Sequence, residues 1–263
     1  MEDRVLNAIG SGEINTENIS FQKIISFRRQ ITGIHDQLGY GRNILTSYQQ
    51  LDQYLHSYGN MISGQWDVFL DKALFHDDRS IDSVCIVSYG CGQALELSIL
   101  FDQIKMGDLQ TGLRLRNITK QIVLIEPSEV ALARAYGVVN TYCPDSKIVA
   151  VQKCIDDVDA SELSLLSTDT NIHIFSNILD IPAFDAGLLF SKMFETCGRH
   201  IILAVSHDRP FEGGSERFYS LEKAVTADKH NDWLRVQRSC IEQFTISNKR
   251  PAISWELMLE VCT

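Results

Sequence analysis

The chain has 263 residues, of which 44% are hydrophobic and 22% charged, and its formal net charge is −10. This ordinary globular composition contains no apolar run near the ~20 residues that a membrane helix needs, and the acidic balance argues against bulk nucleic-acid binding. The seven cysteines form no CxxC pair, so we expect neither a disulfide framework nor a metal site, and predict a reduced, cytoplasmic protein that does not enter the membrane.

Within residues 1–80, a clear helical periodicity begins at residue 44. Residues 1–17 are polar and without periodicity, and we interpret them as a loose leader. Apolar and aromatic residues share one helical face over 44–58, and Gly59 stands where the C-cap of that helix is expected. A second helix is predicted over 65–74. We therefore expect a helical cap over 1–80, which either packs on the rest of the chain or contacts a substrate.

Residues 81–263 change to short apolar runs that alternate with helical patterns. Runs of nearly continuous hydrophobicity are typical of parallel strands that are covered on both faces. Five such strands are predicted, over 83–89, 121–126, 147–153, 171–176 and 200–206. The last two runs, 242–247 and 255–262, have no helix between them, so they must pair antiparallel. The expected fold is α/β, a doubly wound, seven-stranded Rossmann-like sheet with a terminal antiparallel hairpin.

A turn that is poor in side chains joins the first of these strands to its helix. Gly90 and Gly92 fall at the carboxyl end of the strand, where open parallel sheets bind their ligands. Missing Cβ atoms let the backbone approach a ligand closely, and N–H groups at the start of a helix can donate to it. The dinucleotide fingerprint is not met, because Leu95 takes the place of its third glycine, and the turn is not a P-loop.

The second strand ends in a carboxylate, Glu126, at the edge of the same crevice. A carboxylate at this position can accept both hydroxyl groups of a ribose, or it can simply cap the neighbouring helix. Pro127 is expected in the first turn of that helix. Glycine turn and carboxylate together favour a ligand site that holds part of a nucleotide.

The set YGCGQ (89–93), LIEPSEVALARA (124–135), CIDD (154–157) and FSNILDI (175–181) resembles class I S-adenosylmethionine-dependent methyltransferases, over roughly residues 80–263. The resemblance implies that residues 81–263 bind S-adenosylmethionine as a small-molecule cofactor and transfer its methyl group to an acceptor that the sequence does not name. In that family the glycine loop holds the methionine part, the acid after strand two binds the ribose, and an acid after strand three meets the adenine. The implied cofactor-binding residues are Tyr89, Gly90, Cys91, Gly92, Gln93, Glu126, Pro127, Asp156, Asp157, Ser176 and Asn177.

Two positions depart from the family pattern. Ser88 stands where an acid is common, which removes a charged acceptor near the amino group of the ligand, and Ala94 replaces a glycine. An alanine there crowds the ligand if the loop requires a positive φ. Both departures favour a rival interpretation, in which the chain is a non-catalytic methyltransferase-fold module for binding or assembly with a protein partner.

The sequence names no catalytic residue, because methyl transfer depends chiefly on proximity and alignment. Cys91 at a helix N-terminus could have a lowered thiol pKa, although a reactive role is not favoured. The segment 208–220 either contacts substrate through Arg209, Arg217 and Phe218 or is a surface excursion.

Overall fold

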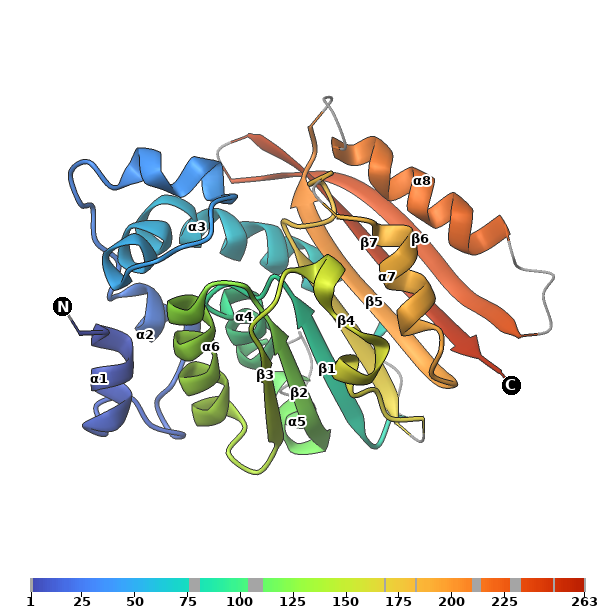
Figure 1. Cartoon of the computed structure of the whole chain (residues 1–263), viewed down its shortest axis with the longest axis horizontal. Coiled ribbons are helices and arrows are strands. Elements are labelled where there is room, and N and C mark those ends of the chain that lie inside the picture. Colours follow the sequence, from blue (N-terminus) through green and yellow to red (C-terminus); the bar gives the residue numbers. More distant parts are fainter. Residues whose placement is uncertain are drawn as a thin grey trace.

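The computed structural model describes residues 2–75, 81–103, 111–167, 169–182, 184–209, 214–227, 233–247 and 249–262. Its centre is a seven-stranded sheet with helices on both faces (Figure 1). The chain begins with helices: α1 (Arg4–Gly10), α2 (Phe21–Ile25), the 3-10 helix η1 (His35–Gly41) and α3 (Tyr48–Lys72). The sheet region follows with β1 (Val84–Tyr89), α4 (Leu95–Asp102), α5 (Thr111–Ile118), β2 (Thr119–Ile125), α6 (Glu129–Tyr142), β3 (Lys147–Val151), η3 (Ile155–Asp157), η4 (Ala160–Leu163), β4 (Thr170–Ser176), α7 (Ala186–Met193), β5 (Gly198–His207), α8 (Gly214–Ala227), β6 (Leu234–Ile246) and β7 (Arg250–Val261).

The strands follow the order β3-β2-β1-β4-β5-β7-β6 across the sheet. Strands β1 to β5 pair parallel, whereas β7 pairs antiparallel with both β5 and β6. The hairpin forms because a short turn joins β6 to β7 and leaves no room for a crossover helix. The predicted fold class, a doubly wound seven-stranded sheet with a terminal antiparallel hairpin, is confirmed.

The sheet has a separate apolar layer on each face. Successive side chains of a strand point to opposite faces, and along β1 the residues Val84 and Ile86 contact one layer while Cys85, Val87 and Tyr89 contact the other. The first layer also contains buried residues of α1, α2 and α3, together with those of α4 and α6. The N-terminal helices therefore share a hydrophobic core with one face of the sheet.

The loose leader that we expected over residues 1–17 is wrong. Helix α1 begins at an N-cap, Asp3, whose Oδ1 accepts from the N–H of Val5 at 2.9 Å. The other oxygen of Asp3 accepts from the fully buried guanidinium of Arg134 on α6, at 2.8 Å. The pairing spans 131 residues, which is why the local polar composition did not reveal it.

The two helices expected over 44–58 and 65–74 are one continuous helix, α3. It begins with a capping box, in which Ser47 and Gln50 satisfy each other's backbone N–H groups. Gly59 lies inside this helix and is not its C-cap. A Cβ there would lie 2.6 Å from Cδ1 of Ile25, so the glycine makes room for the packing of α2 against α3.

A chain of buried hydrogen bonds crosses the second layer of the core. The Nε2 of His200 lies 2.9 Å from the carbonyl oxygen of Thr196, which can only accept. The Nδ1 of a neutral His200 then accepts from Nε2 of His173 at 3.0 Å, and the Nδ1 of His173 accepts from the hydroxyl of Tyr89 at 3.0 Å. This direction of donation requires both imidazoles to be neutral.

We expect this histidine pair to weaken the fold in acid. Burial lowers the pKa of His200 to about 4 and also lowers that of His173. Below the ordinary pKa of 6.5, His200 is protonated in the unfolded chain but stays neutral in the folded chain. The contribution of His200 to stability therefore falls by about 2 kcal/mol between pH 8 and pH 5. Urea unfolding at both pH values should show that His200→Gln has lost this pH dependence.

Substitution of the exposed His56 on α3 with glutamine is the control for loss of a histidine as such. The pH dependence of each variant is compared with that of wild type, because other groups also titrate over this range. The buried Glu96, with its pKa raised to about 7, changes stability in the opposite direction, and it does so in every protein compared. An unchanged difference between wild type and His200→Gln at the two pH values would contradict the prediction.

Candidate functional site

The glycine loop between β1 and α4 has a left-handed backbone at every second residue. The φ angles are +59° at Gly90, +49° at Gly92 and +58° at Ala94. A Cβ at Gly92 would meet no atom within 4 Å, so the loop is open on that side. A Cβ at Gly90 would lie 3.1 Å from Cδ1 of Ile178 in the loop after β4. Gly92 is therefore the residue at which a ligand can approach the backbone.

Ala94 adopts the positive φ that the sequence left open, which costs an alanine roughly 1–2 kcal/mol. The residue is fully buried in the first apolar layer. Its methyl group therefore packs in the core and does not crowd the open side of the loop at Gly92.

Glu126 lies directly after β2 and joins the glycine loop to the start of α6. Its Oε2 accepts from the N–H of Gly92 and its Oε1 from the N–H of Ser128, both at 2.9 Å. Burial raises the pKa of this carboxyl group. Each carboxylate oxygen has a further lone pair, so the hydroxyl groups of a ribose can still be accepted. Pro127 precedes the N-cap and is not in the first helical turn, because the Oγ of Ser128 accepts from Ala131 N–H and makes Ser128 the N-cap.

Tyr89 and Gln93 direct their side chains into the protein. The ring of Tyr89 stacks on Phe175 with the ring centroids 4.5 Å apart. The side chain of Gln93 donates to the carbonyl of Leu51 at 3.1 Å and accepts from Arg134 at 2.7 Å. If these two residues contact a cofactor in this arrangement, they do so through their main chain.

Cys91 is buried, and α4 begins only at Leu95, so the thiol does not lie at the helix N-terminus as we expected. Burial, followed by the nearby Glu126 and Glu96, raises the thiol pKa well above its ordinary value. A nucleophilic thiolate is therefore not available at this position.

The carboxylates after β3 lie at the surface. Asp156 and Asp157 belong to the short helix η3 and are both exposed. The Oδ1 of Asp156 accepts at 2.9 Å from the N–H of Asp185, which is the N-cap of α7. Asp156 thus helps to hold α7, and the assignment of either residue to an adenine stays a prediction.

Ser176 and Asn177, at the carboxyl end of β4, both bind side chains of α3. The amides of Asn177 and Gln65 exchange two hydrogen bonds of 2.9 and 3.2 Å. The indole N–H of Trp66 donates to the Oγ of Ser176 at 2.9 Å. Asn177 has a φ of +55°, which asparagine tolerates better than most residues.

Helix α3 and the turn before it therefore contact three of the predicted motifs, and α3 lies across the sheet region in Figure 1. The carbonyl of Leu45 accepts from Ser128 at the start of α6, and the carbonyl of Leu51 accepts from Gln93 in the glycine loop. Gln65 and Trp66 contact the end of β4. Sequence reasoning did not reveal these contacts, because backbone carbonyls and an amide pair 112 residues apart leave no local signal.

Two of the three residues proposed as substrate contacts in segment 208–220 are structural. Phe218 is fully buried. Arg217 donates to the carbonyls of Ile181 and Phe184 and lies over the ring of Phe184. Residues 210–213 lie outside the described residues. Arg209 stays a prediction.

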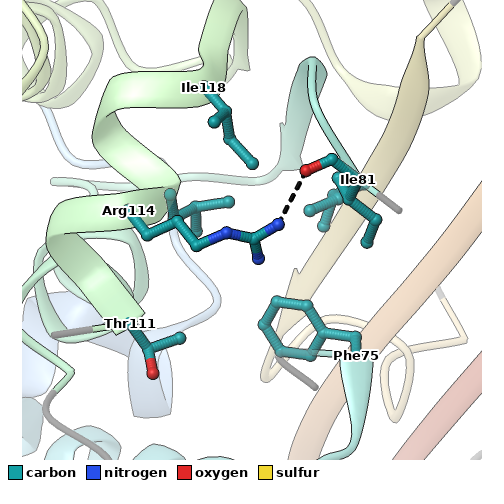
Figure 2. A pocket seen from close by; sticks show the side chains of 7 residues that line it. Phe75, Ile81, Thr111, Arg114 and Ile118 are labelled. Atoms are coloured by element: carbon teal, nitrogen blue, oxygen red, sulfur yellow. Dashed lines mark hydrogen bonds between the residues drawn. The ribbon is translucent and has the colours of Figure 1, made fainter. Parts of the chain in front are cut away.

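A small recess lies at the opposite end of the sheet (Figure 2). It is mainly apolar and is lined by Phe75, Ile81, Thr111, Arg114, Leu115, Ile118 and Ile172. Arg114 donates to the carbonyl of Ile81, just before β1, at 2.8 Å. The recess is thus near the amino end of β1, away from the glycine loop, and is not part of the candidate site.

Among the residues that the structure describes, no group of three or more histidine, cysteine, aspartate or glutamate side chains could hold a metal ion. None of the described helices is both long and apolar enough to cross a membrane.

Several solved methyltransferases are similar to this chain at low identity. A SAM-dependent methyltransferase of Leishmania major is 13% identical, with a TM-score of 0.43, and the match covers 85% of this chain and 82% of that protein. The magnesium protoporphyrin IX methyltransferase of Synechocystis, solved with bound SAM, is 10% identical, with a TM-score of 0.42. The match covers 91% of this chain and 98% of that protein. An rRNA methylase of Streptococcus thermophilus is 12% identical, with a TM-score of 0.41, and the match covers 80% of this chain and 98% of that protein.

No protein-family model matches the chain, and no curated protein sequence matches it. At the identities and TM-scores given above, the similarity carries no argument about activity. The fold assignment rests on the observed strand order and on the antiparallel β7.

Proposed function

We propose that the chain is an S-adenosylmethionine-dependent methyltransferase, whose acceptor the site does not identify. The observation that carries the proposal is the bond between Glu126 at the end of β2 and the N–H of Gly92, 2.9 Å long, in a glycine loop that is open beside Gly92. It brings a carboxylate and a bare stretch of backbone together at the carboxyl ends of adjacent strands. This is where an open α/β sheet binds a nucleoside-containing ligand.

The residues present fit such a cofactor. Glu126 has lone pairs left for ribose hydroxyl groups, and Gly92 offers close approach to the loop. Asp157 is an exposed carboxylate just after β3 and is the candidate partner for an adenine amine. Bound S-adenosylmethionine would supply an electrophilic methyl group. The chain's own contribution is to hold donor and acceptor in alignment.

The rival function, a non-catalytic module for binding or assembly, is favoured by one observation. The side chains of Ser176 and Asn177, two of the implied cofactor-binding residues, are bonded to Trp66 and Gln65 of α3. An acceptor that uses these groups must displace α3 or approach from another side. A cytoplasmic location and a protein partner remain proposals of the same kind.

The test of the proposed function is ligand-dependent stability of wild type and Gly92→Val. S-adenosylhomocysteine at ~100 times its dissociation constant should raise the unfolding free energy of wild type by about 2.7 kcal/mol. Valine at Gly92 would fill the open side of the loop, so this ligand-induced increase should disappear. Thermal melting with and without ligand measures both effects.

Gly12 provides a matched control. It too has a positive φ, +78°, with no atom within 4 Å of its Cβ position, but it lies in the exposed turn after α1. Gly12→Val should lose roughly 1–2 kcal/mol from the same backbone strain and keep the full ligand-induced shift. Absence of any shift in wild type at millimolar ligand would overturn the proposed function and favour the non-catalytic rival.

A further inference from the structure

A second buried carboxylate lies beside the glycine loop. Glu96, on the first turn of α4, is only 4% exposed. Its Oε1 accepts from the Oγ of Ser88 on β1 at 2.8 Å. Ser88 lies two residues before Gly90, so the bond places a charge-bearing group at the deep side of the loop, next to a β1 residue that has no charge of its own.

In the part of the chain that the structure describes, neither Glu96 nor Glu126 forms an ion pair. The buried guanidinium of Arg134 reaches the loop through Gln93, and it is also bonded to Asp3 and Asp52. A buried carboxylate without a paired cation costs folding free energy. Glu96 therefore destabilises the free protein, and a bound cation would offset this cost.

The groups that face Glu96 from the surrounding elements do not supply that charge. They are the hydroxyl of Ser88, Tyr54 of α3, the thiol of Cys91 and the carboxylate of Glu126. Burial, with contributions from both carboxylates, raises the pKa of Tyr54 and of Cys91, so both stay neutral near pH 7. Burial and, to a smaller extent, Glu126 raise the pKa of Glu96 to about 7.

We propose that Glu96, oriented by Ser88, binds the ammonium group at the amino-acid end of the cofactor and so selects ligands that carry this cation. The inference rests on the proposed function and assigns a binding residue that lies outside the four motifs of the sequence. An ammonium group fits better than a sulfonium, because it donates hydrogen bonds to a carboxylate as well as carrying the charge. A metal ion is the alternative cation, but the described residues provide no cluster of three ligands for one.

Binding of an ammonium group should be coupled to release of a proton. Burial raises the pKa of Glu96 to about 7, and pairing with a cation favours the ionised form, so binding should release a proton near neutral pH. The proton passes to the buffer. The affinity for an ammonium-bearing ligand should therefore fall as the pH drops below 7, where the free protein holds this proton more fully.

The experiment is calorimetric titration of the full-length chain with two ligands. S-adenosylhomocysteine carries the ammonium group, whereas 5′-methylthioadenosine has the same nucleoside and thioether without the amino acid. In Glu96→Gln, which keeps a polar partner for Ser88, the affinity for S-adenosylhomocysteine should fall between about tenfold and a hundredfold, while that for 5′-methylthioadenosine stays unchanged. Buffers of different ionisation enthalpy should reveal proton release in wild type that is absent in the variant.

Glu129→Gln is the matched control, because Glu129 is an exposed glutamate on the first turn of α6. It should leave both affinities and the proton release unchanged. Equal weakening of both ligands by Glu96→Gln, or no weakening of either, would overturn the assignment of Glu96 while leaving the proposed function intact. If wild type binds Mg²⁺ without a nucleoside and Glu96→Gln does not, the assignment of Glu96 to an ammonium group is also overturned. Failure of wild type to bind either nucleoside would overturn both proposals.

Discussion

Arg134→Met should lower the free energy of unfolding by about 3–5 kcal/mol at pH 7. Arg134 is fully buried and donates to Asp3 at 2.8 Å, Asp52 at 3.0 Å and Gln93 at 2.7 Å. Methionine fills much of the same volume but leaves two buried carboxylates without a cation. Urea unfolding of both proteins measures the loss.

Arg29→Met is the matched control for Arg134→Met. Arg29 also approaches Asp52, at 3.6 Å, but its side chain is 39% exposed. An exposed pair of this kind contributes roughly 0–1 kcal/mol. Adding Asp3→Asn and Asp52→Asn to Arg134→Met should recover much of the lost stability, because the uncompensated charges are then gone. A loss below about 1 kcal/mol in Arg134→Met would contradict the prediction.

Residues 81–263 expressed alone should not form a stable, cooperatively folded protein. The helices of residues 1–80 and the sheet share one apolar layer, in which Leu55 and Trp66 of α3 are fully buried. Removing these helices exposes that layer to water, which costs about 25 cal/mol for each Å² of apolar surface. Because a domain is stable by only about 5–15 kcal/mol, we expect this cost to prevent stable folding. Solubility, thermal melting and binding of a hydrophobic dye measure the outcome.

Trp66→Ala in the full chain tests the same interface with a smaller change than the truncation. Loss of the buried indole and of its bond to Ser176 should cost about 3–5 kcal/mol, while the chain still folds. A soluble 81–263 fragment that melts cooperatively at the temperature of the full chain would show that residues 1–80 are a separable domain, and would contradict the prediction.

The features of this protein that the sequence alone predicted are those with a local physical cause. Continuous apolar runs predicted β1 to β5, because a strand covered on both faces needs apolar side chains on both sides. The turn-rich link between β6 and β7 predicted the hairpin. Gly90 and Gly92 predicted a tight turn at the carboxyl end of β1, and their φ angles of +59° and +49° agree with this.

Other features depended on which segments meet in space. Gly59 reads locally as a helix end, yet it lies within α3, and Ile25 occupies the space that a Cβ at this position would fill. Tyr89 belongs to the predicted loop motif, but the alternation along β1 turns its ring into the core against Phe175. In both cases the neighbour that decides the outcome is remote in sequence.

The electrostatics of the candidate site were likewise decided by the tertiary structure. Glu126 could be singled out from its place after a strand, whereas Glu96 looks like any first-turn acid until its contact with Ser88 and its burial are known. Nothing in the local sequence marks Arg134 as buried. Its two carboxylate partners, Asp3 at the N-cap of α1 and Asp52 of α3, meet it only when these segments pack on α6. Periodicity and turn residues encode local conformation and burial, but a charge finds its partner only when the elements are assembled.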